Sequence, residues 1–146
     1  MKIIGTFDKE KRQILVPVGI KIDTFDLKGS AEFLIDTGST ISFINESTAL
    51  KLGLDYSKLL NIEPSTGIGG EAEIYQIDGY TRLTFENEEE HKTIQRKNFL
   101  VMKHIFDEHV KENTRKKILS IQGIIGMDMI MGFRFTTAGL NYTLDV

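Results

Sequence analysis

The sequence predicts a mainly β protein with one or two short helices. Short segments rich in branched and aromatic residues recur along the chain of 146 residues, and residues of this kind favour strands. Turn-forming residues separate these segments. Helix signals are confined to short stretches, so helices are expected to be a minor part of the fold.

Composition and turn chemistry predict the first strands. Gln13–Ile22 is rich in branched residues, and Pro17 within it indicates an edge position or a bulge, because proline cannot donate to a ladder. The segment 26–30 has turn chemistry. It leads into Ala31–Ile35, which we expect to be a short buried strand. Ile41–Ile44 is predicted as a further strand.

A short helix is predicted for Glu46–Leu52. Asn45 precedes it and is a good N-cap, because its side-chain oxygen can accept a free N–H group of the first turn. Gly53 follows it and provides the stop, since glycine readily adopts the left-handed conformation that ends many helices.

The second half of the chain continues the β pattern. A charged insertion at about 86–120 contains His104–Leu119, which is predicted to be an exposed helix or a mobile loop. Met127–Phe133 is a candidate short helix, and Phe135–Val146 is a closing hairpin that turns at Ala138-Gly139. All elements are expected to form a single domain, 1–146. The strands predicted here are Glu71–Ile77, Tyr80–Phe85, Phe99–Met102 and Ile121–Ile125.

Composition excludes several function classes. The formal net charge is −3, so the chain has no basic surplus for neutralising phosphates, and we expect no nucleic-acid partner. The chain has no cysteine, which excludes disulfides, thiol nucleophiles and cysteine-ligated zinc. Its histidines are His91, His104 and His109, and the last two are poorly spaced for a shared helix face. We therefore expect neither a metal nor a cofactor.

The N-terminal residues lack the apolar core of a signal peptide. No apolar run along the chain approaches the length of a membrane span. These two patterns predict a cytoplasmic protein that does not associate with a membrane.

The motif Asp36-Thr37-Gly38-Ser39 follows the apolar run 33–35 and occurs once. It places one carboxylate on a tight turn at the end of a strand. We expect Gly38 to point an N–H group toward the carboxylate and Thr37 to turn its hydroxyl inward and lock the loop. Ser39 is expected to donate a hydrogen bond that favours the ionised carboxylate and thus an acidic working range.

A second glycine-rich segment lies at 65–70 and ends in Gly67-Ile68-Gly69-Gly70. Three glycines in four residues leave the backbone free to turn. The strand predicted after it makes this segment the tip of a hairpin.

The order of these motifs resembles that of the retropepsin-like aspartic proteases. In that family an apolar strand ends in Asp-Thr/Ser-Gly, a strand and a short helix follow, then a glycine-rich flap, and last a strand that ends in two apolar residues and a glycine. Here the matching parts are Asp36-Thr37-Gly38-Ser39, Ala49–Leu54, Gly67–Gly70 and Ile124-Ile125-Gly126. Together these landmarks cover about residues 12 to 146 and are specific, although each alone is weak.

The resemblance implies a half-barrel that is active as a two-fold homodimer. It implies that Asp36 is the catalytic carboxylate and that Gly126 packs beneath the active-site loop. It also implies that the flap at Gly67–Gly70 closes over an extended peptide or protein substrate. Two copies of Asp36 would then activate one water for peptide hydrolysis. Asp128 is expected to open a short helix rather than to act as the second carboxylate.

Other interpretations are possible for the same residues. Asp36-Thr37-Gly38-Ser39 could be a plain turn between strands. The fold could also be a catalytically silent dimer that binds extended peptides or partner proteins without cleaving them. A phosphoryl-transfer loop is disfavoured, because such loops need a second Asp where Gly38 stands or a Lys where Thr37 stands.

Overall fold

The computed structural model describes residues 1–67 and 70–146 and confirms the mainly β class. Strands dominate the described residues, which also contain three α-helices and one short 3₁₀ helix. The strands are β1 (Lys2–Thr6), β2 (Leu15–Ile22), β3 (Leu27–Ile35), β4 (Phe43–Ile44), β5 (Leu60–Gly67), β6 (Gly70–Gln76), β7 (Tyr80–Glu86), β8 (His91–Lys97), β9 (Leu100–Ile105), β10 (Gly123–Ile125), β11 (Arg134–Ala138) and β12 (Asn141–Asp145). The helices are α1 (Glu46–Leu52), η1 (Tyr56–Lys58), α2 (Glu112–Ser120) and α3 (Met127–Ile130).

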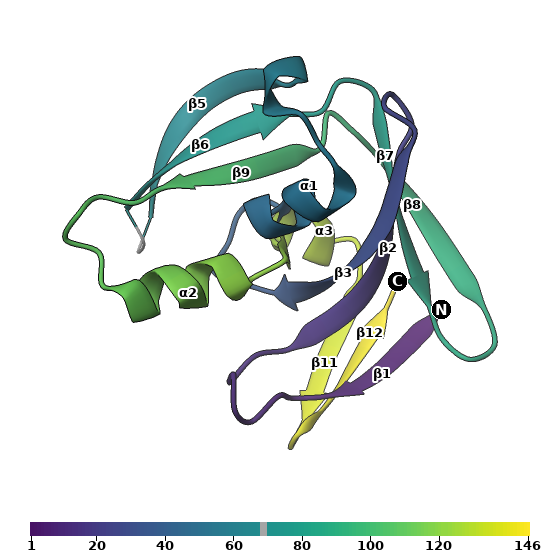
Figure 1. Ribbon diagram of the computed structural model, residues 1–146. Helices are drawn as coiled ribbons and strands as arrows, with labels where there is room; N and C mark the ends of the chain where they lie inside the picture. The colour runs from purple at the N-terminus through teal and green to yellow at the C-terminus, as the bar shows by residue number, and fades with distance from the viewer. Residues whose placement is uncertain (68–69) are drawn as a thin grey trace.

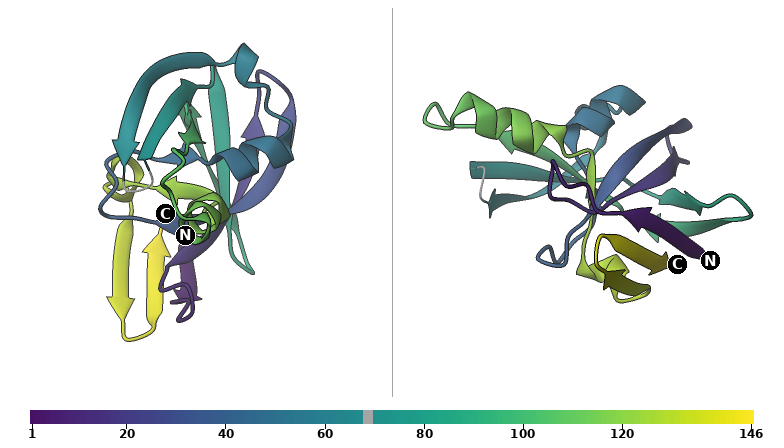
Figure 2. Two further views of the ribbon diagram at one scale, coloured as in Figure 1. Left: turned by 60° about the vertical axis from the view of Figure 1, so that its left-hand side comes forward. Right: turned by 90° about the horizontal axis from the view of Figure 1, so that it is seen from below.

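The strands form two sheets. The larger has the order β5-β6-β9-β4-β10-β3-β2-β7-β8, and the smaller has the order β1-β12-β11. Figure 1 shows the β5–β6 hairpin and β9 at the top of the molecule, with the smaller sheet at the bottom. Figure 2 shows the β11–β12 hairpin extending away from the rest of the fold. Two helices, α1 and α3, lie between these two ends of the molecule (Figure 1).

The core is built on β2 and β3. Alternate residues of β2 are buried, and the antiparallel register sets Val16 opposite Phe33 of β3. Both of these side chains are fully buried, and each such burial contributes about 1.5–3 kcal/mol. Pro17 is exposed and pairs with β3, whereas the pairing of β2 with β7 begins only at Gly19. The proline therefore lies where β2 pairs, among the described strands, with β3 alone. This position suits a residue that has no N–H group to donate to a second neighbouring strand.

Helix α1 has the predicted bounds. The Asn45 side chain accepts a hydrogen bond from the Glu46 N–H group, and Gly53 adopts the left-handed conformation with φ of 80°. The Gly53 N–H group donates to Leu50 and Ala49 carbonyl oxygens. Local capping chemistry thus accounts for both ends of this helix.

Asn45 also connects three elements. Its Nδ2 group donates to the carbonyl oxygens of Ile118, at 3.1 Å, and Ile121, at 2.7 Å. Its Oδ1 atom lies 2.8 Å from Nε2 of His104. Burial lowers the pKa of His104 from its ordinary value, and Glu46 opposes this shift. Because Asn45 is 1% exposed, these bonds form out of contact with water and hold α2 against α1 and β9.

The charged stretch 86–120 is more regular than its composition suggests. No strand was predicted for His91–Lys97, yet these residues form β8, which pairs with β7 along its whole length. Most of its side chains are exposed, so the strand lacks the apolar alternation that would have revealed it. The stretch His104–Leu119 comprises the end of β9, the connecting segment 106–111 and most of helix α2.

The C-terminal elements agree with their predictions. Helix α3 occupies the first part of the predicted segment Met127–Phe133. The closing hairpin consists of β11 and β12, and Gly139 adopts φ of +61° in its turn. Among the described residues, no helix is long and apolar enough to cross a membrane.

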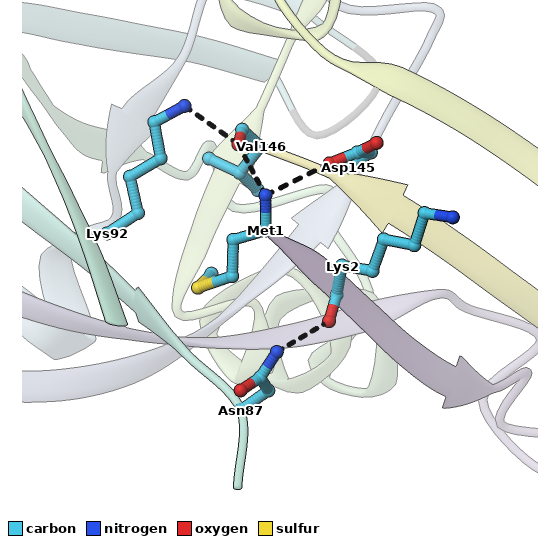
Figure 3. A network of polar contacts seen from close by, with 6 residues as sticks. All are labelled: Met1, Lys2, Asn87, Lys92, Asp145 and Val146. Carbon is cyan, nitrogen blue, oxygen red and sulfur yellow. Dashed lines mark hydrogen bonds and ion pairs between the residues drawn. The ribbon is translucent and has the colours of Figure 1, made fainter. Parts of the chain in front are cut away.

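The two ends of the chain meet beside β8 (Figure 3). The Met1 amino group donates to Asp145 Oδ1 at 3.1 Å, and the Val146 N–H group donates to the Met1 carbonyl oxygen at 2.9 Å. Lys92 of β8 donates to the Val146 carbonyl oxygen, and Asn87 donates to that of Lys2. The smaller sheet is therefore tied to the β7–β8 hairpin by polar contacts.

We predict that Asn45→Ala will lower the free energy of unfolding by about 2–4 kcal/mol, because it removes a helix cap and leaves buried carbonyl groups without a donor. Urea unfolding of both proteins measures the change. Asn113→Ala serves as the control, since Asn113 is exposed on α2 and its loss is expected to cost less than about 0.5 kcal/mol. Equal effects of the two substitutions would contradict the role given to Asn45.

Candidate active site

Asp36 lies where β3 ends beside β10. These strands pair in parallel, with Ile35 opposite Ile125, and the Asp36 N–H group donates to the Ile125 carbonyl oxygen at 3.0 Å. The Gly38 N–H group donates to Asp36 Oδ1 at 2.9 Å, and the Ser39 N–H group donates to the Asp36 carbonyl oxygen at 3.2 Å. The carboxylate is partly buried, and one of its oxygens is oriented by the turn that follows it.

The hydroxyl groups beside Asp36 differ from expectation. Ser39 Oγ donates to the Ile41 carbonyl oxygen at 2.8 Å, so the predicted bond from Ser39 to the Asp36 carboxylate is wrong. The turn directs the Ser39 side chain toward the backbone of Ile41. The predicted effect of this hydroxyl on the working pH therefore has no basis in the structure. Thr37 is exposed, and no hydrogen bond of its hydroxyl is found within the described part of this chain.

Gly126 lies directly against the loop that carries Asp36. A Cβ atom at this position would lie 2.8 Å from the Ser39 carbonyl oxygen and closer still to that of Ile41. The next residue, Met127, donates its N–H group to the Ser39 carbonyl oxygen at 2.8 Å. The Asp128 N–H group reaches the Thr40 carbonyl oxygen at 3.3 Å. The start of α3 is thus bonded to the loop, and only glycine permits this approach.

A polar chain that the sequence analysis did not identify supports the same contact. Ser42 is 1% exposed; its Oγ atom accepts from the Gly126 N–H group at 2.9 Å and donates to Asp128 Oδ1 at 2.5 Å. The other carboxylate oxygen of Asp128 lies 3.0 Å from Arg96 Nη2. Asp128 therefore opens α3, as expected, and its carboxylate is engaged by Ser42 and Arg96. No local pattern in the sequence links these residues.

The predicted flap corresponds to the β5–β6 hairpin. Gly67 and Gly70 are paired across it, while Ile68 and Gly69 lie outside the described residues. Strand β6 pairs in turn with β9, so the hairpin is continuous with the sheet that carries Asp36. Figure 1 shows this hairpin projecting from the sheet.

A small apolar cluster connects the hairpin to the Asp36 loop. Ala72 of β6 is buried together with Phe43, which closely follows the loop, and Met102 of β9. Ile74 of β6 and Ile41 of the loop pack against them. Apolar contacts of this kind fix the base of the hairpin relative to the loop.

Tyr56 strengthens the base of the hairpin from the opposite side. Its hydroxyl donates to the Met102 carbonyl oxygen at 3.2 Å, and its ring meets that of Tyr75 edge to face at 4.9 Å. Burial raises the pKa of Tyr56, so its hydroxyl remains a donor at physiological pH. A hydrogen bond from the Tyr75 hydroxyl to Glu73 also raises the pKa of Tyr75.

In the described ranges, no group of three or more His, Asp or Glu side chains is arranged to hold a metal ion. Of the histidines, His104 is bonded to Asn45. The Asp36 turn itself presents a carboxylate that accepts a backbone N–H group, and such a carboxylate can act as a general base.

We predict that Gly126→Ala will lower the free energy of unfolding by about 1–3 kcal/mol, because the added methyl group must displace the backbone of the Asp36 loop. Thermal or urea unfolding measures this loss. Gly19→Ala is the matched control, since a Cβ there would meet Thr84 Cβ at 3.4 Å, an ordinary contact. A stable Gly126→Ala protein with an unchanged loop would refute the role of this contact.

Comparison with known proteins places this geometry in a family. The family model described as "Aspartyl protease" matches residues 20–129, whereas a search of curated proteins found no match. A retropepsin-like aspartic protease from Rickettsia conorii is similar in structure, with a TM-score of 0.57, 16% identity, and coverage of 99% of this chain and 90% of that chain. EIAV protease with the inhibitor HBY-793 gives a TM-score of 0.47 and 17% identity over 86% of this chain and 91% of its own. The match spans most of the chain and includes Asp36, and this protein therefore belongs to the aspartyl protease family and has the retropepsin-like fold.

Proposed function

We propose that this protein is an aspartic endopeptidase that works as a homodimer, with one Asp36 contributed by each subunit. The observation that carries this proposal is the single turn that presents Asp36 at the end of β3, with the Gly38 N–H group 2.9 Å from its carboxylate. Asp128, the other acid close to the loop, is engaged by Ser42 and Arg96. We infer that the second carboxylate for the reaction comes from another copy of the chain.

The proposed reaction uses the two carboxylates as one unit. Because two neighbouring carboxylates cannot both ionise cheaply, the pair holds one proton between them and supplies an acid and a base at the same pH. The ionised Asp36 removes a proton from the water, whose oxygen attacks the peptide carbonyl carbon. The protonated Asp36 gives its proton to the carbonyl oxygen, and a gem-diol forms. The Asp36 that took the water proton then gives it to the amide nitrogen, while the other Asp36 takes a proton from one diol hydroxyl. The C–N bond breaks, an amine and a carboxylic acid are released, and the pair again holds one proton.

The remaining site residues have supporting roles in this proposal. Gly38 orients the carboxylate, Thr37 lies exposed beside it, and Ser39 stabilises the turn through its bonds to Asp36 and Ile41. Gly126 keeps the loop against α3. The flap formed by Gly67–Gly70 closes over an extended peptide or protein substrate, because glycine lets a lid tip rearrange and approach a peptide backbone closely.

The proposed dimer contact is the free edge of β11. In the described structure this strand has β12 as its one neighbour, and its residues Thr136, Thr137 and Ala138 are exposed and uncharged. The exposed residue Arg134 at the other end of the strand is charged, but an edge segment without charges, such as 136–138, is a ready template for pairing with another chain. A two-fold axis beside β11 would join the two smaller sheets into one and make the contact isologous.

We predict that Asp36→Asn will abolish cleavage of a diverse peptide pool read by mass spectrometry, with a rate loss of at least about a thousandfold, because the acid–base pair is lost. Asp26→Asn is the matched control. Asp26 is exposed with φ of 50°, a conformation that asparagine tolerates, so this variant is expected to cleave as the unmodified protein does.

Two outcomes would contradict the endopeptidase proposal. Cleavage that persists in the Asp36→Asn protein would assign the activity to a contaminant or to other residues. Peptide binding without cleavage by either protein, from samples shown to be folded dimers, would favour the alternative of a catalytically silent peptide-binding dimer.

The proposed dimer leads to a separate prediction for mixtures of unmodified and Asp36→Asn chains. A ninefold excess of Asp36→Asn protein, mixed with unmodified protein and left to exchange, should reduce activity to about a tenth, because most unmodified chains would then pair with an inactive copy. Peptide cleavage at a constant amount of unmodified protein measures this. The matched control adds Thr136→Pro to the inactive chain, which should weaken the inhibition. A monomeric enzyme would keep its full activity in both mixtures.

A further inference from the structure

A basic groove lies beside the strand that carries Asp36. It has a volume of about 540 Å³ and opens between the turn that precedes β2 and the C-terminal end of α2. Three cationic side chains and one carboxylate line it, although the whole chain has a formal net charge of −3. The lining residues are Glu10, Lys11, Arg12, Gln13, Lys117 and Ser120.

The turn on one side of the groove is held by its own backbone and by Asp8. The Asp8 N–H group donates to the Gln13 carbonyl oxygen at 2.9 Å, and a return bond of 3.2 Å closes the turn. Asp8 Oδ1 accepts from the N–H groups of Glu10 and Lys11, both at 3.0 Å. Arg12 adopts φ of 54°, a conformation that is uncommon for residues other than glycine. The turn therefore presents its charged residues from a defined backbone.

The opposite side of the groove is also fixed. Lys117 and Ser120 stand in the last turn of α2, and Ser120 Oγ donates to the Lys117 carbonyl oxygen at 2.6 Å. The neighbouring carbonyl groups of Ile118 and Ile121 accept from the buried Asn45. The basic side chains on both sides are exposed and can reach a ligand in the groove.

The groove adjoins the catalytic residue. The Ile35 N–H group donates to the Ile14 carbonyl oxygen at 2.9 Å. Because the two segments run antiparallel, the next residues beyond this bonded pair are Asp36 on one segment and Gln13 on the other. Gln13 lines the groove. It also lines a smaller cavity together with Lys11, Glu32 and Leu34, and Leu34 lies two residues before Asp36. We therefore expect a peptide bound at Asp36 to reach these side chains.

We propose that this groove selects peptides that carry acidic residues close to the bond to be cleaved. The inference rests on the proposed function, because it assigns the substrate class of the same site. Arginine and lysine bind carboxylates through charge-assisted hydrogen bonds. Since the side chains are exposed, each pair contributes modestly and is weakened by salt.

The charge of the whole protein makes this inference sharply testable. A chain with a net charge of −3 should attract basic peptides if only its overall charge mattered. We expect the groove to reverse this order, because at short range Lys11, Arg12 and Lys117 outnumber Glu10 and Glu32, the acids that line the groove and the adjoining cavity. The order of affinity among matched peptides therefore separates a local effect from a general one.

The test measures peptide binding to Asp36→Asn protein, which is not expected to cleave. Three fluorescein-labelled peptides share one apolar centre and carry flanking Glu, Gln or Lys residues, and fluorescence anisotropy gives their affinities. We expect the Glu peptide to bind about threefold to tenfold more tightly than the Gln peptide, and the Lys peptide to bind most weakly. Salt at about 0.5 M should remove most of this difference.

Charge-reversal variants locate the effect. Adding Lys11→Glu and Lys117→Glu should remove the preference for the Glu peptide, whereas adding Lys28→Glu should preserve it. Lys28 is exposed near the start of β3, at the end of this strand opposite Asp36, and its substitution changes the net charge in the same direction. A preference that survives reversal at Lys11 and Lys117 would overturn the assignment to the groove.

Cleavage of the same peptides by the unmodified protein separates this inference from the proposed function. Equal binding of all three peptides, together with cleavage by the unmodified protein, would overturn the acidic selectivity and leave the endopeptidase proposal intact. Selective binding of the Glu peptide without any cleavage would support the groove and refute the endopeptidase. Tightest binding of the Lys peptide would also overturn the selectivity, because overall charge would then govern recognition.

Discussion

The position of Asp36 depends on the close contact between its loop and the segment that begins at Gly126. Because Gly126 has no side chain, the loop carbonyl groups can lie against its Cα atom, and the N–H group of Met127 reaches Ser39. Buried Ser42 completes the contact by bonding both to Gly126 and to Asp128. This unit links the core strands β3 and β10 to α3, so the carboxylate is held by the main body of the fold rather than by a free loop.

Two features of this fold bear on what surrounds the carboxylate. The apolar cluster around Phe43 and Ala72 joins the β5–β6 hairpin to the Asp36 loop, so that hairpin and carboxylate share one support. Asn45 holds the end of α2, and with it Lys117, beside the turn that carries Lys11. The fold thereby places basic side chains near the Asp36 turn in a chain whose formal net charge is −3.

Features that rest on neighbouring residues could be predicted from the sequence. The cap at Asn45 and the stop at Gly53 gave the bounds of α1, and the order of the glycine-containing motifs led to the family. Strand β8 was missed, because its side chains are mostly exposed and polar and only its pairing with β7 makes it a strand. The partner of Ser39 was wrong, since the hydroxyl follows the direction of the turn and meets Ile41 instead of Asp36.

The sequence by itself determined the mainly β class, the turn at Asp36 and the capped helix that follows, because each depends on residue types within a few positions of one another. Only the tertiary structure decided that β10 lies between β3 and β4, that Arg96 meets Asp128, and that Lys11 and Lys117 line one groove. These contacts join residues far apart in the chain. They arise from strand register and from the packing of whole elements, and neither is encoded in any short stretch of sequence.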